Sequence, residues 1–254
     1  MTIIVVPLAG CSEYFPQSEY PYPVPLIEVA GLPMIQYVVE NLKELDRNAT
    51  FVFVVQQQDC QRFYLDRSLK LLAPGAAVVV LQGATQGALC SCLMAIDHID
   101  PAEPLVVANG DQYFDIEMSL ILPRFEKEGA DAGCLYFRSV LPRWSYVRLD
   151  GDHVVEAAEK NPISRHAIAG FYYFRRGEFF LDAAMRSMLQ RVTQDGRYFI
   201  APALNQLIIE GRRVIAKPVA NEKYLSFFTP HRIEEFEAQH GQRIAARVAK
   251  SDMA

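Results

Sequence analysis

The sequence predicts an α/β protein whose mixed, mostly parallel central sheet is covered by helices on both faces. In the first half of the chain, short apolar runs rich in β-branched residues alternate with segments of helical periodicity. After about residue 130 the expected strands follow one another more closely, and a hairpin signal occurs. The 254 residues, of which 51% are hydrophobic, are enough for one domain with a sizeable core.

The elements of the first half can be assigned in order. Residues 3–8 form a short, continuous, β-branched run, which is typical of a buried strand. Pro33 suits the first turn of a helix over residues 33–45, where the apolar side chains share one face. We expect further strands at 51–55, 77–81 and 105–108, and further helices at 62–72 and 88–96.

The second half is richer in strands. Asp150-Gly151-Asp152 separates two alternating segments, 145–149 and 153–158, and predicts a hairpin. We expect these mixed strands to cover one end of the sheet. The remaining expected elements are strands at 132–138, 169–174 and 214–218, helices at about 177–189 and 199–210, and a charged helical tail over 232–248.

Composition and charge exclude several classes of protein. A net charge of −5 gives no indication of the basic surface that binds nucleic acid. No apolar run approaches the roughly 20 residues that a membrane helix needs. The first residues lack the Lys or Arg of a signal peptide, so we expect a cytoplasmic location without membrane insertion.

The cysteines and histidines give no metal or redox motif. The five cysteines form no C-x-x-C pair, so we expect small buried thiols rather than disulfides or a zinc site. A catalytic thiol at Cys11 is the alternative, and it would need a paired base. The histidines lack metal-ligand spacing, which favours surface roles; they are His98, His153, His166, His231 and His240.

The chemistry is expected at one edge of the sheet. Ligands of open α/β sheets bind outside the carboxyl ends of the strands, which places residues 8–15, 82–87 and 109–112 around one crevice. A dinucleotide fold would need G-x-G-x-x-G after the first strand, but residues 10–15 contain one glycine. The G-x-x-x-x-G-K-[ST] loop of nucleoside triphosphatases is absent from the sequence.

Several short motifs occur in a fixed order between residues 9 and 230. Matches to an A-G-x-G-[ST]-R, P-K-P-L and G-K-P opening are Ala9, Gly10, Phe15, Pro23, Pro25, Leu26, Gly31, Pro33 and Met34. Later matches are Thr85-Gln86-Gly87-Ala88, Leu105–Gln112, Glu159-Lys160-Asn161-Pro162, Ala169–Phe174 and Thr229-Pro230. With these motifs the chain resembles the sugar-phosphate nucleotidylyltransferases, or NDP-sugar pyrophosphorylases. The N-G-D-Q and E-K-x-x-I-S motifs are most similar to those of the branch found in capsule and lipopolysaccharide gene clusters.

The resemblance implies a three-layer, Rossmann-like nucleotide-diphospho-sugar transferase fold in a single domain, 1–254. Residues 1–130 would form the nucleotide-binding half, 131–230 the sugar-phosphate side and 231–254 a helical tail. The implied reaction joins a nucleoside triphosphate and a sugar phosphate into an NDP-sugar and pyrophosphate, with Mg²⁺, for surface polysaccharide. A homo-oligomer is compatible with this family.

The resemblance also implies site residues. Asp111 would hold Mg²⁺ and Lys160 would meet the sugar phosphate, so these are the expected catalytic residues. Further contacts to nucleotide or sugar phosphate are expected from Leu8, Ala9, Gly10, Gln82, Gly87, Asn109, Gln112, Glu159 and Gly170. Alternatives remain, because Asp111 could cap a turn, Gln112 could be solvated and Gly87 could serve only close helix packing. Lys160 could be a surface partner of Glu159.

Other positions depart from the family pattern. Tyr14, Val24 and Leu32 stand where the family carries cations, and Ser12 replaces the second loop glycine. Removing one preorganised transition-state donor costs about 10²–10³ in rate. Candidates to replace the lost cations are Arg148, Arg165, Lys160 and Lys223. Ser226 is the best match for a second metal ligand, although a poor one, and Phe228 stands where a glycine commonly precedes T-P.

Three functions stay open. The first is an enzyme of the NDP-sugar pyrophosphorylase type, and the second is an inactive homologue that binds a nucleotide or sugar and acts as a regulator. The third is a nucleotide-sugar glycosyltransferase, for which Asp111-Gln112-Tyr113 is only a weak match to the D-x-D metal motif. Tyr14, Tyr20 and Tyr22 would either form a lid over the crevice or pack locally.

Overall fold

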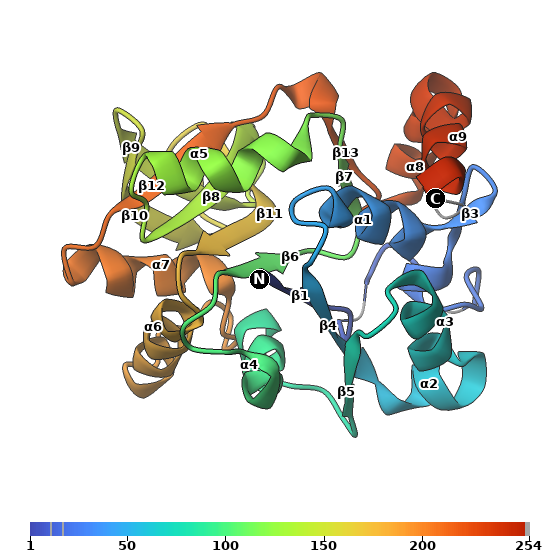
Figure 1. Ribbon diagram of the computed structural model, residues 1–254, viewed down its shortest axis with the longest axis horizontal. Coiled ribbons are helices and arrows are strands. Elements are labelled where there is room, and N and C mark those ends of the chain that lie inside the picture. The colour runs from blue at the N-terminus through green and yellow to red at the C-terminus, as the bar shows by residue number, and fades with distance from the viewer. Residues whose placement is uncertain (11, 17, 252–254) are drawn as a thin grey trace.

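A nine-stranded mixed sheet forms the middle layer of the computed structural model, which describes residues 1–10, 12–16 and 18–251 (Figure 1). In sheet order the strands are β5 (Ala77–Leu81), β4 (Thr50–Gln56), β1 (Ile3–Pro7), β6 (Leu105–Ala108), β11 (His166–Phe174), β8 (Ala132–Arg138), β12 (Val214–Pro218), β10 (His153–Glu159) and β9 (Ser145–Asp150). The first four strands are parallel, whereas β11 runs antiparallel to both of its neighbours β6 and β8. The predicted α/β class and mostly parallel sheet are therefore confirmed.

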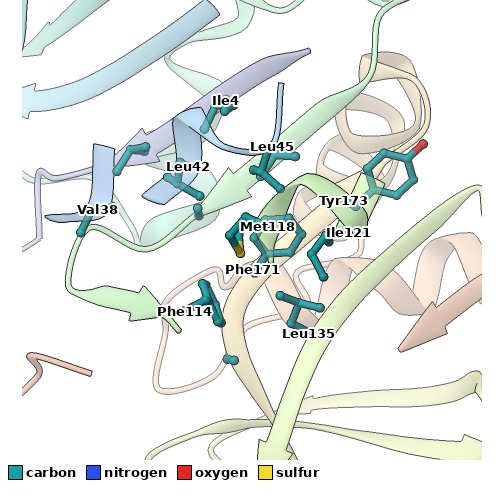
Figure 2. Close-up of a cluster of buried hydrophobic side chains, with 14 of the residues drawn as sticks. Ile4, Val38, Leu42, Leu45, Phe114, Met118, Ile121, Leu135, Phe171 and Tyr173 are labelled. Carbon is teal, nitrogen blue, oxygen red and sulfur yellow. The ribbon is translucent and has the colours of Figure 1, made fainter. Parts of the chain in front are cut away.

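Helices cover both faces of the sheet, because side chains along each strand alternate between two cores. On β1, Ile4 and Val6 face one core, and Ile3 and Val5 face the other. Figure 2 shows part of the first core, in which Val38 and Leu42 of a helix meet residues of the central strands. Its helices are α1 (Met34–Lys43), α2 (Gln57–Phe63), α3 (Leu65–Leu72) and α5 (Ile121–Lys127). The second core is covered by α4 (Ala88–Leu93), α6 (Gly177–Leu189) and α7 (Ile200–Ile209).

A third apolar cluster ties the N-terminal loop to the C-terminal tail. The tail consists of α8 (Pro230–Phe236), a π-helical turn (Glu237–Gly241) and α9 (Gln242–Ser251), and it lies beside α1 and β3 (Figure 1). The cluster combines Phe15 and Tyr37 with Phe227 and Phe236. Two short sheets complete it: β7 (Gln112–Phe114) with β13 (Tyr224–Ser226), and β2 (Glu28–Val29) with β3 (Leu32–Pro33).

Some expected boundaries were wrong. The second-half strands do not cover one end of the sheet; they extend it, because β11 pairs directly with β6 through Phe171 and Ala108. The helix expected at 62–72 starts at Gln57 and is divided by Tyr64, whose φ of 54° is left-handed. The helix expected at 88–96 ends at Leu93, and α5, β7 and β13 were not anticipated.

No helix in the described part of the chain has the length and apolar character needed to cross a membrane.

Candidate active site

The carboxyl ends of β1 and β6 bring two predicted segments together. The strands are paired in parallel, with Ile3 opposite Leu105, so Leu8 and the segment 109–112 leave the sheet side by side. Gly110 allows the closest approach, since a Cβ there would lie 2.2 Å from Leu8 Cδ2. Two of the three segments expected around the crevice, 8–15 and 109–112, therefore meet at this edge, and a side chain at position 110 would displace the Leu8 side chain.

Gly170 joins the same cluster from β11. Its φ is +61°, and a Cβ on it would lie 2.5 Å from Asn109 Nδ2 and 2.6 Å from Gln112 Oε1. Its carbonyl oxygen accepts the Asn109 backbone N–H and the Gln112 Nε2–H, both at 2.9 Å. Gln112 is 2% exposed and also accepts the Tyr224 hydroxyl at 3.4 Å, so it is not the solvated loop residue of the alternative interpretation. It holds β11, β7 and β13 together behind the crevice.

Asp111 is half-buried in the segment between β6 and β7. Its carbonyl oxygen accepts the Phe227 backbone N–H at 2.7 Å, which fixes the backbone between β6 and β7. Burial raises the pKa of the Asp111 carboxyl to about 6. Within the described residues, its side chain forms no ion pair. A carboxylate kept out of water without a cation is unfavourable for folding, which is typical of a group that awaits a ligand.

The described residues fit Mg²⁺ only in part. Asp111 can supply one carboxylate oxygen, and a magnesium site needs one or two carboxylates together with substrate phosphates. Ser226 lies opposite Gln112 in the β7–β13 pair, but its hydroxyl accepts the Phe228 N–H at 3.3 Å. No group of three or more His, Cys, Asp or Glu side chains in the described part of the chain could cage a metal.

Lys160 occupies a strained position beyond β10. Its φ of 52° is left-handed, which is uncommon outside glycine, and its N–H donates to the Trp144 carbonyl at 3.0 Å. Its Nζ lies 3.6 Å from Asp195 Oδ2 and 5.4 Å from the centre of the Phe199 ring. Its ion-pair partner is thus Asp195 and not Glu159.

Glu159 is held by a different group. Its carboxylate accepts the Ser145 hydroxyl across the β9–β10 hairpin. Burial raises the pKa of Glu159, and the hydrogen bond from Ser145 and the charge of Lys160 oppose that rise. Glu159 therefore braces the strand end that carries Lys160.

Gly87 is in contact with a segment that the sequence did not indicate. Its φ is +114°, and a Cβ there would lie 2.3 Å from the Tyr198 carbonyl oxygen. Tyr198 N–H donates to the Gln86 carbonyl at 2.7 Å. The same segment carries Asp195, so the α6–α7 connection reaches both Gly87 and Lys160. Close packing is a sufficient reason for glycine at 87, while Gln82 is exposed and outside these contacts.

The loop over residues 8–16, which follows β1, carries no Lys or Arg among its described residues. The Ala9 carbonyl accepts Gln56 Nε2–H at 2.9 Å, and Gly10 is exposed with open space around it. Tyr14 donates its backbone N–H to Ser12 Oγ at 3.2 Å and places its ring 4.9 Å from that of Phe228. Cys11 lies outside the described residues.

Comparison with known proteins decides the family. A model of the nucleotidyl transferase family matches residues 20–217, which is more than half of the chain. The chain belongs to the nucleotidyl transferase family. No match was found among the curated proteins.

Solved structures of nucleotidyl transferases share this fold. A nucleoside-diphosphate-sugar pyrophosphorylase from Vibrio cholerae RC9 is 23% identical, with a TM-score of 0.81, over 93% of this chain and 100% of that one. An inositol-1-phosphate CTP transferase from T. maritima is 15% identical, with a TM-score of 0.74, over 95% of each chain. At these identities the likeness establishes the fold alone.

The residues at the positions where the resemblance predicts cations take part in packing. Val24 and Leu32 are partly buried and pack against the third apolar cluster. Tyr20 packs edge-on against Phe15 at 5.0 Å. Together with the Tyr14 contact to Phe228, these contacts favour local packing over a free aromatic lid.

Two of the proposed replacement cations are engaged elsewhere. Arg148 pairs with Glu156 at 2.7 Å on the exposed side of the β9–β10 hairpin, and Lys223 pairs with Asp115 at 2.9 Å. Arg165 is exposed and forms no ion pair within the described residues. A cation that the sequence did not single out, Arg143, lies instead over the Trp144 and Phe228 rings, at 5.0 and 5.6 Å.

The buried thiols behave as expected for core residues. Cys92 and Cys134 are fully buried, and burial raises the pKa of each to about 12. Cys60 and Cys90 are half-buried free thiols, and burial raises their pKa values as well. None of these four is poised as a nucleophile.

Proposed function

We propose that this chain transfers a nucleotidyl group from a nucleoside triphosphate to a sugar phosphate, as an enzyme of the NDP-sugar pyrophosphorylase type. The observation that carries the proposal is that Leu8 meets Gly110 at the carboxyl ends of β1 and β6, and that Gly170 of β11 holds the same segment, within a chain of the nucleotidyl transferase family. Such an edge is where α/β folds bind their ligands. The N-G-D-Q and E-K-x-x-I-S motifs, which resemble those of the capsule and lipopolysaccharide branch, support a product that is made in the cytoplasm and used for surface polysaccharide.

The reaction asks the protein for positioning and charge neutralisation. An oxygen of the sugar phosphate attacks the α-phosphorus, the bond from that phosphorus to the bridging oxygen breaks, and pyrophosphate leaves with the bond electrons. Leu8, Ala9 and Gly10 would frame the nucleotide with backbone groups. Gly87 and its neighbours would lie on the base side, and Lys160 would meet the sugar phosphate once it leaves Asp195.

Asp111 would hold a magnesium ion that arrives with the nucleotide phosphates. Such an ion offsets the charge that develops on the transferring phosphoryl group. The half-buried carboxylate suits this role, because an ion-bound carboxylate no longer bears the free-energy cost of its uncompensated charge. Asn109 and Gln112 would keep the segment in place through Gly170.

A second candidate is a nucleotide-binding or sugar-binding regulator without turnover. It is favoured by the same loop, in which Val24 and Leu32 are packed as apolar residues and Tyr14 contacts Phe228. Two or three missing cations would suppress nucleotidyl transfer strongly unless others replace them.

Release of pyrophosphate distinguishes the two candidates. The full chain is incubated with Mg²⁺, each common nucleoside triphosphate and a panel of sugar and polyol phosphates. We expect turnover that Asp111→Asn reduces by at least about 10²-fold. An Asp150→Asn variant, in the β9–β10 turn, is the matched control and should keep full activity. Binding of the triphosphate by calorimetry without any turnover would favour the regulator, and transfer from an intact nucleotide sugar would indicate a glycosyltransferase.

A further inference from the structure

Arg143 is held in a fixed place by a locked turn between β8 and β9. It is the third residue of Leu141-Pro142-Arg143-Trp144, in which Trp144 N–H donates to the Leu141 carbonyl at 3.3 Å. Proline at the second position presets the backbone of this type of turn. The hydroxyl of the buried Tyr146 donates to the same Leu141 carbonyl at 2.6 Å. The turn is therefore secured both by its own backbone and from the sheet below it.

Aromatic rings, and no carboxylate, hold the Arg143 side chain. Its guanidinium carbon lies 5.0 Å from the centre of the Trp144 ring and 5.6 Å from that of Phe228, and the two rings are 5.8 Å apart. Arginine suits such a seat because its planar, weakly hydrated cation stacks on aromatic faces. Within the described residues, Arg143 forms no ion pair, and its Nε is buried without a hydrogen-bond partner.

The two rings that hold Arg143 adjoin the segment that carries Asp111. Phe228 follows Phe227, whose N–H donates to the Asp111 carbonyl, and the Tyr14 ring lies 4.9 Å from the Phe228 ring. Trp144 also packs 6.3 Å from Tyr224, the residue whose hydroxyl reaches Gln112.

The charges around Tyr224 agree with this placement. Burial is the main cause that raises the pKa of Tyr224, and the negative charge of Asp111 raises it further. The hydroxyl of Ser226 and the positive charges of Arg232 and Arg143 act in the opposite direction. Asp111 and Arg143 thus lie close enough to influence the same hydroxyl group.

We propose that Arg143 binds a phosphoryl group of the ligand in this crevice. The inference rests on the proposed function for the identity of the ligand, and it names a residue that the loop motifs do not. The resemblance places an arginine at Tyr14 and a glycine at Phe228; the Tyr14 ring contacts the Phe228 ring, and the Arg143 guanidinium lies over the Phe228 ring. A cation lost from the loop is replaced by one from the β8–β9 turn. A guanidinium with free hydrogen-bond donors recognises phosphoryl oxygens in a planar, directional way.

Calorimetry on the full chain tests this assignment with three probes: inorganic pyrophosphate, each common nucleoside triphosphate and glucose 1-phosphate. We expect Arg143→Ala to weaken binding about 10- to 100-fold, since a hydrogen bond to a charged group contributes about 1.5–3 kcal/mol. Arg143→Lys should retain part of the affinity because it keeps the charge but loses the planar seat. Arg148→Ala is the matched control, because that arginine pairs with Glu156 on an exposed surface, and it should bind like the parent.

The probes also distinguish the source of the phosphoryl group. Loss confined to pyrophosphate and the triphosphates assigns Arg143 to the nucleotide, and loss confined to glucose 1-phosphate assigns it to the sugar phosphate. Either result supports the proposal. Equal affinity of parent and Arg143→Ala for every probe overturns it, as does a parent that binds none of them.

Folding and turnover are measured on the same variants. Unchanged thermal midpoints show that lost affinity reflects lost contacts. If Arg143→Ala does not fold, Phe228→Leu takes its place, since it removes one ring of the seat while keeping an apolar side chain; weaker binding supports the proposal and unchanged binding overturns it. Binding that depends on Arg143 without release of pyrophosphate upholds this inference and refutes the enzymatic function.

Discussion

The Asp111 carboxyl offers a test of the site through protein stability. Its pKa is 3.8 in an ordinary environment and about 6 in the folded protein, because burial disfavours the charged form. A folded-state pKa above the unfolded one means that the folded protein binds the proton more tightly. The free energy of unfolding therefore falls as pH rises from 3.8 to about 6, and the full cost remains at higher pH.

Asp111→Asn should remove the free-energy cost of burying the carboxylate charge while keeping the shape of the side chain. Two pKa values that differ by about two correspond to about 3 kcal/mol, and the buried amide retains a smaller desolvation cost of its own. We expect the variant to be about 1–3 kcal/mol more stable at pH 7.5 and nearly equal to the parent near pH 4. For a chain of this size, 1 kcal/mol corresponds to about 2–4 °C in the thermal midpoint.

Urea unfolding of parent and variant at pH 4 and pH 7.5 measures the difference. Asp115→Asn is the control of opposite sign: hydrogen bonding by Arg243, with that of Lys223, lowers the pKa of Asp115 to about 2. The stability that Asp115 contributes is present above pH 3.8 and is lost as pH falls towards 2, so that variant should be less stable at pH 7.5. A gain for Asp111→Asn of the same size at both pH values, or no gain at pH 7.5, would refute the reasoning.

Three further predictions concern residues around the site. Gly170→Ala should lower the free energy of unfolding by about 2–4 kcal/mol, because a Cβ would overlap neighbouring side chains and the φ is left-handed. Gly151→Ala is the control: its φ is also left-handed but its surroundings are open, so urea unfolding should show a loss of only about 1–2 kcal/mol. Asp195→Asn removes the ion-pair partner of Lys160, so calorimetry should show a few-fold higher affinity for glucose 1-phosphate. The thermal midpoint should stay unchanged, because the ion pair is exposed. A lower affinity would contradict this prediction. If the chain is a regulator without turnover, Tyr14→Arg with Val24→Lys should raise its affinity for nucleoside triphosphates in calorimetry, because both changes add a cation to the loop; unchanged affinity would argue against missing loop cations as the cause of inactivity.

Much of the fold was predictable because local signals agreed with the tertiary structure. The strands β5, β6, β8 and β12 begin and end where the sequence indicated, since each is a short apolar run bounded by turn residues. The strands β7 and β13 could not be seen locally, because Gln112 pairs with Ser226 across more than a hundred residues. The break at Tyr64 was equally hidden, as an aromatic residue is not expected in a left-handed conformation.

The site was predictable in part for the same reason. Leu8 and the segment 109–112 follow adjacent parallel strands, so the strand-end rule brings them together without any knowledge of side chains. Asp195-Gly196 is a turn signal, with φ values of 51° and 71°, but nothing in the sequence says that this turn reaches Lys160. Arg143 was missed because its importance depends on two rings, one of them 85 residues further along the chain.

The departures from the family pattern form connected sets in space. Val24 and Leu32, at positions where the resemblance predicts lysine, pack against the cluster that also holds the C-terminal helices. Tyr14 contacts Phe228, and the Phe228 ring lies under the Arg143 guanidinium. Random loss of function would remove cations without adding matched contacts, since isolated substitutions have no reason to meet. These contacts support our proposal that Arg143 of the β8–β9 turn supplies the positive charge of the site, and the raised pKa of Asp111 supports the proposal that its carboxylate meets a bound cation.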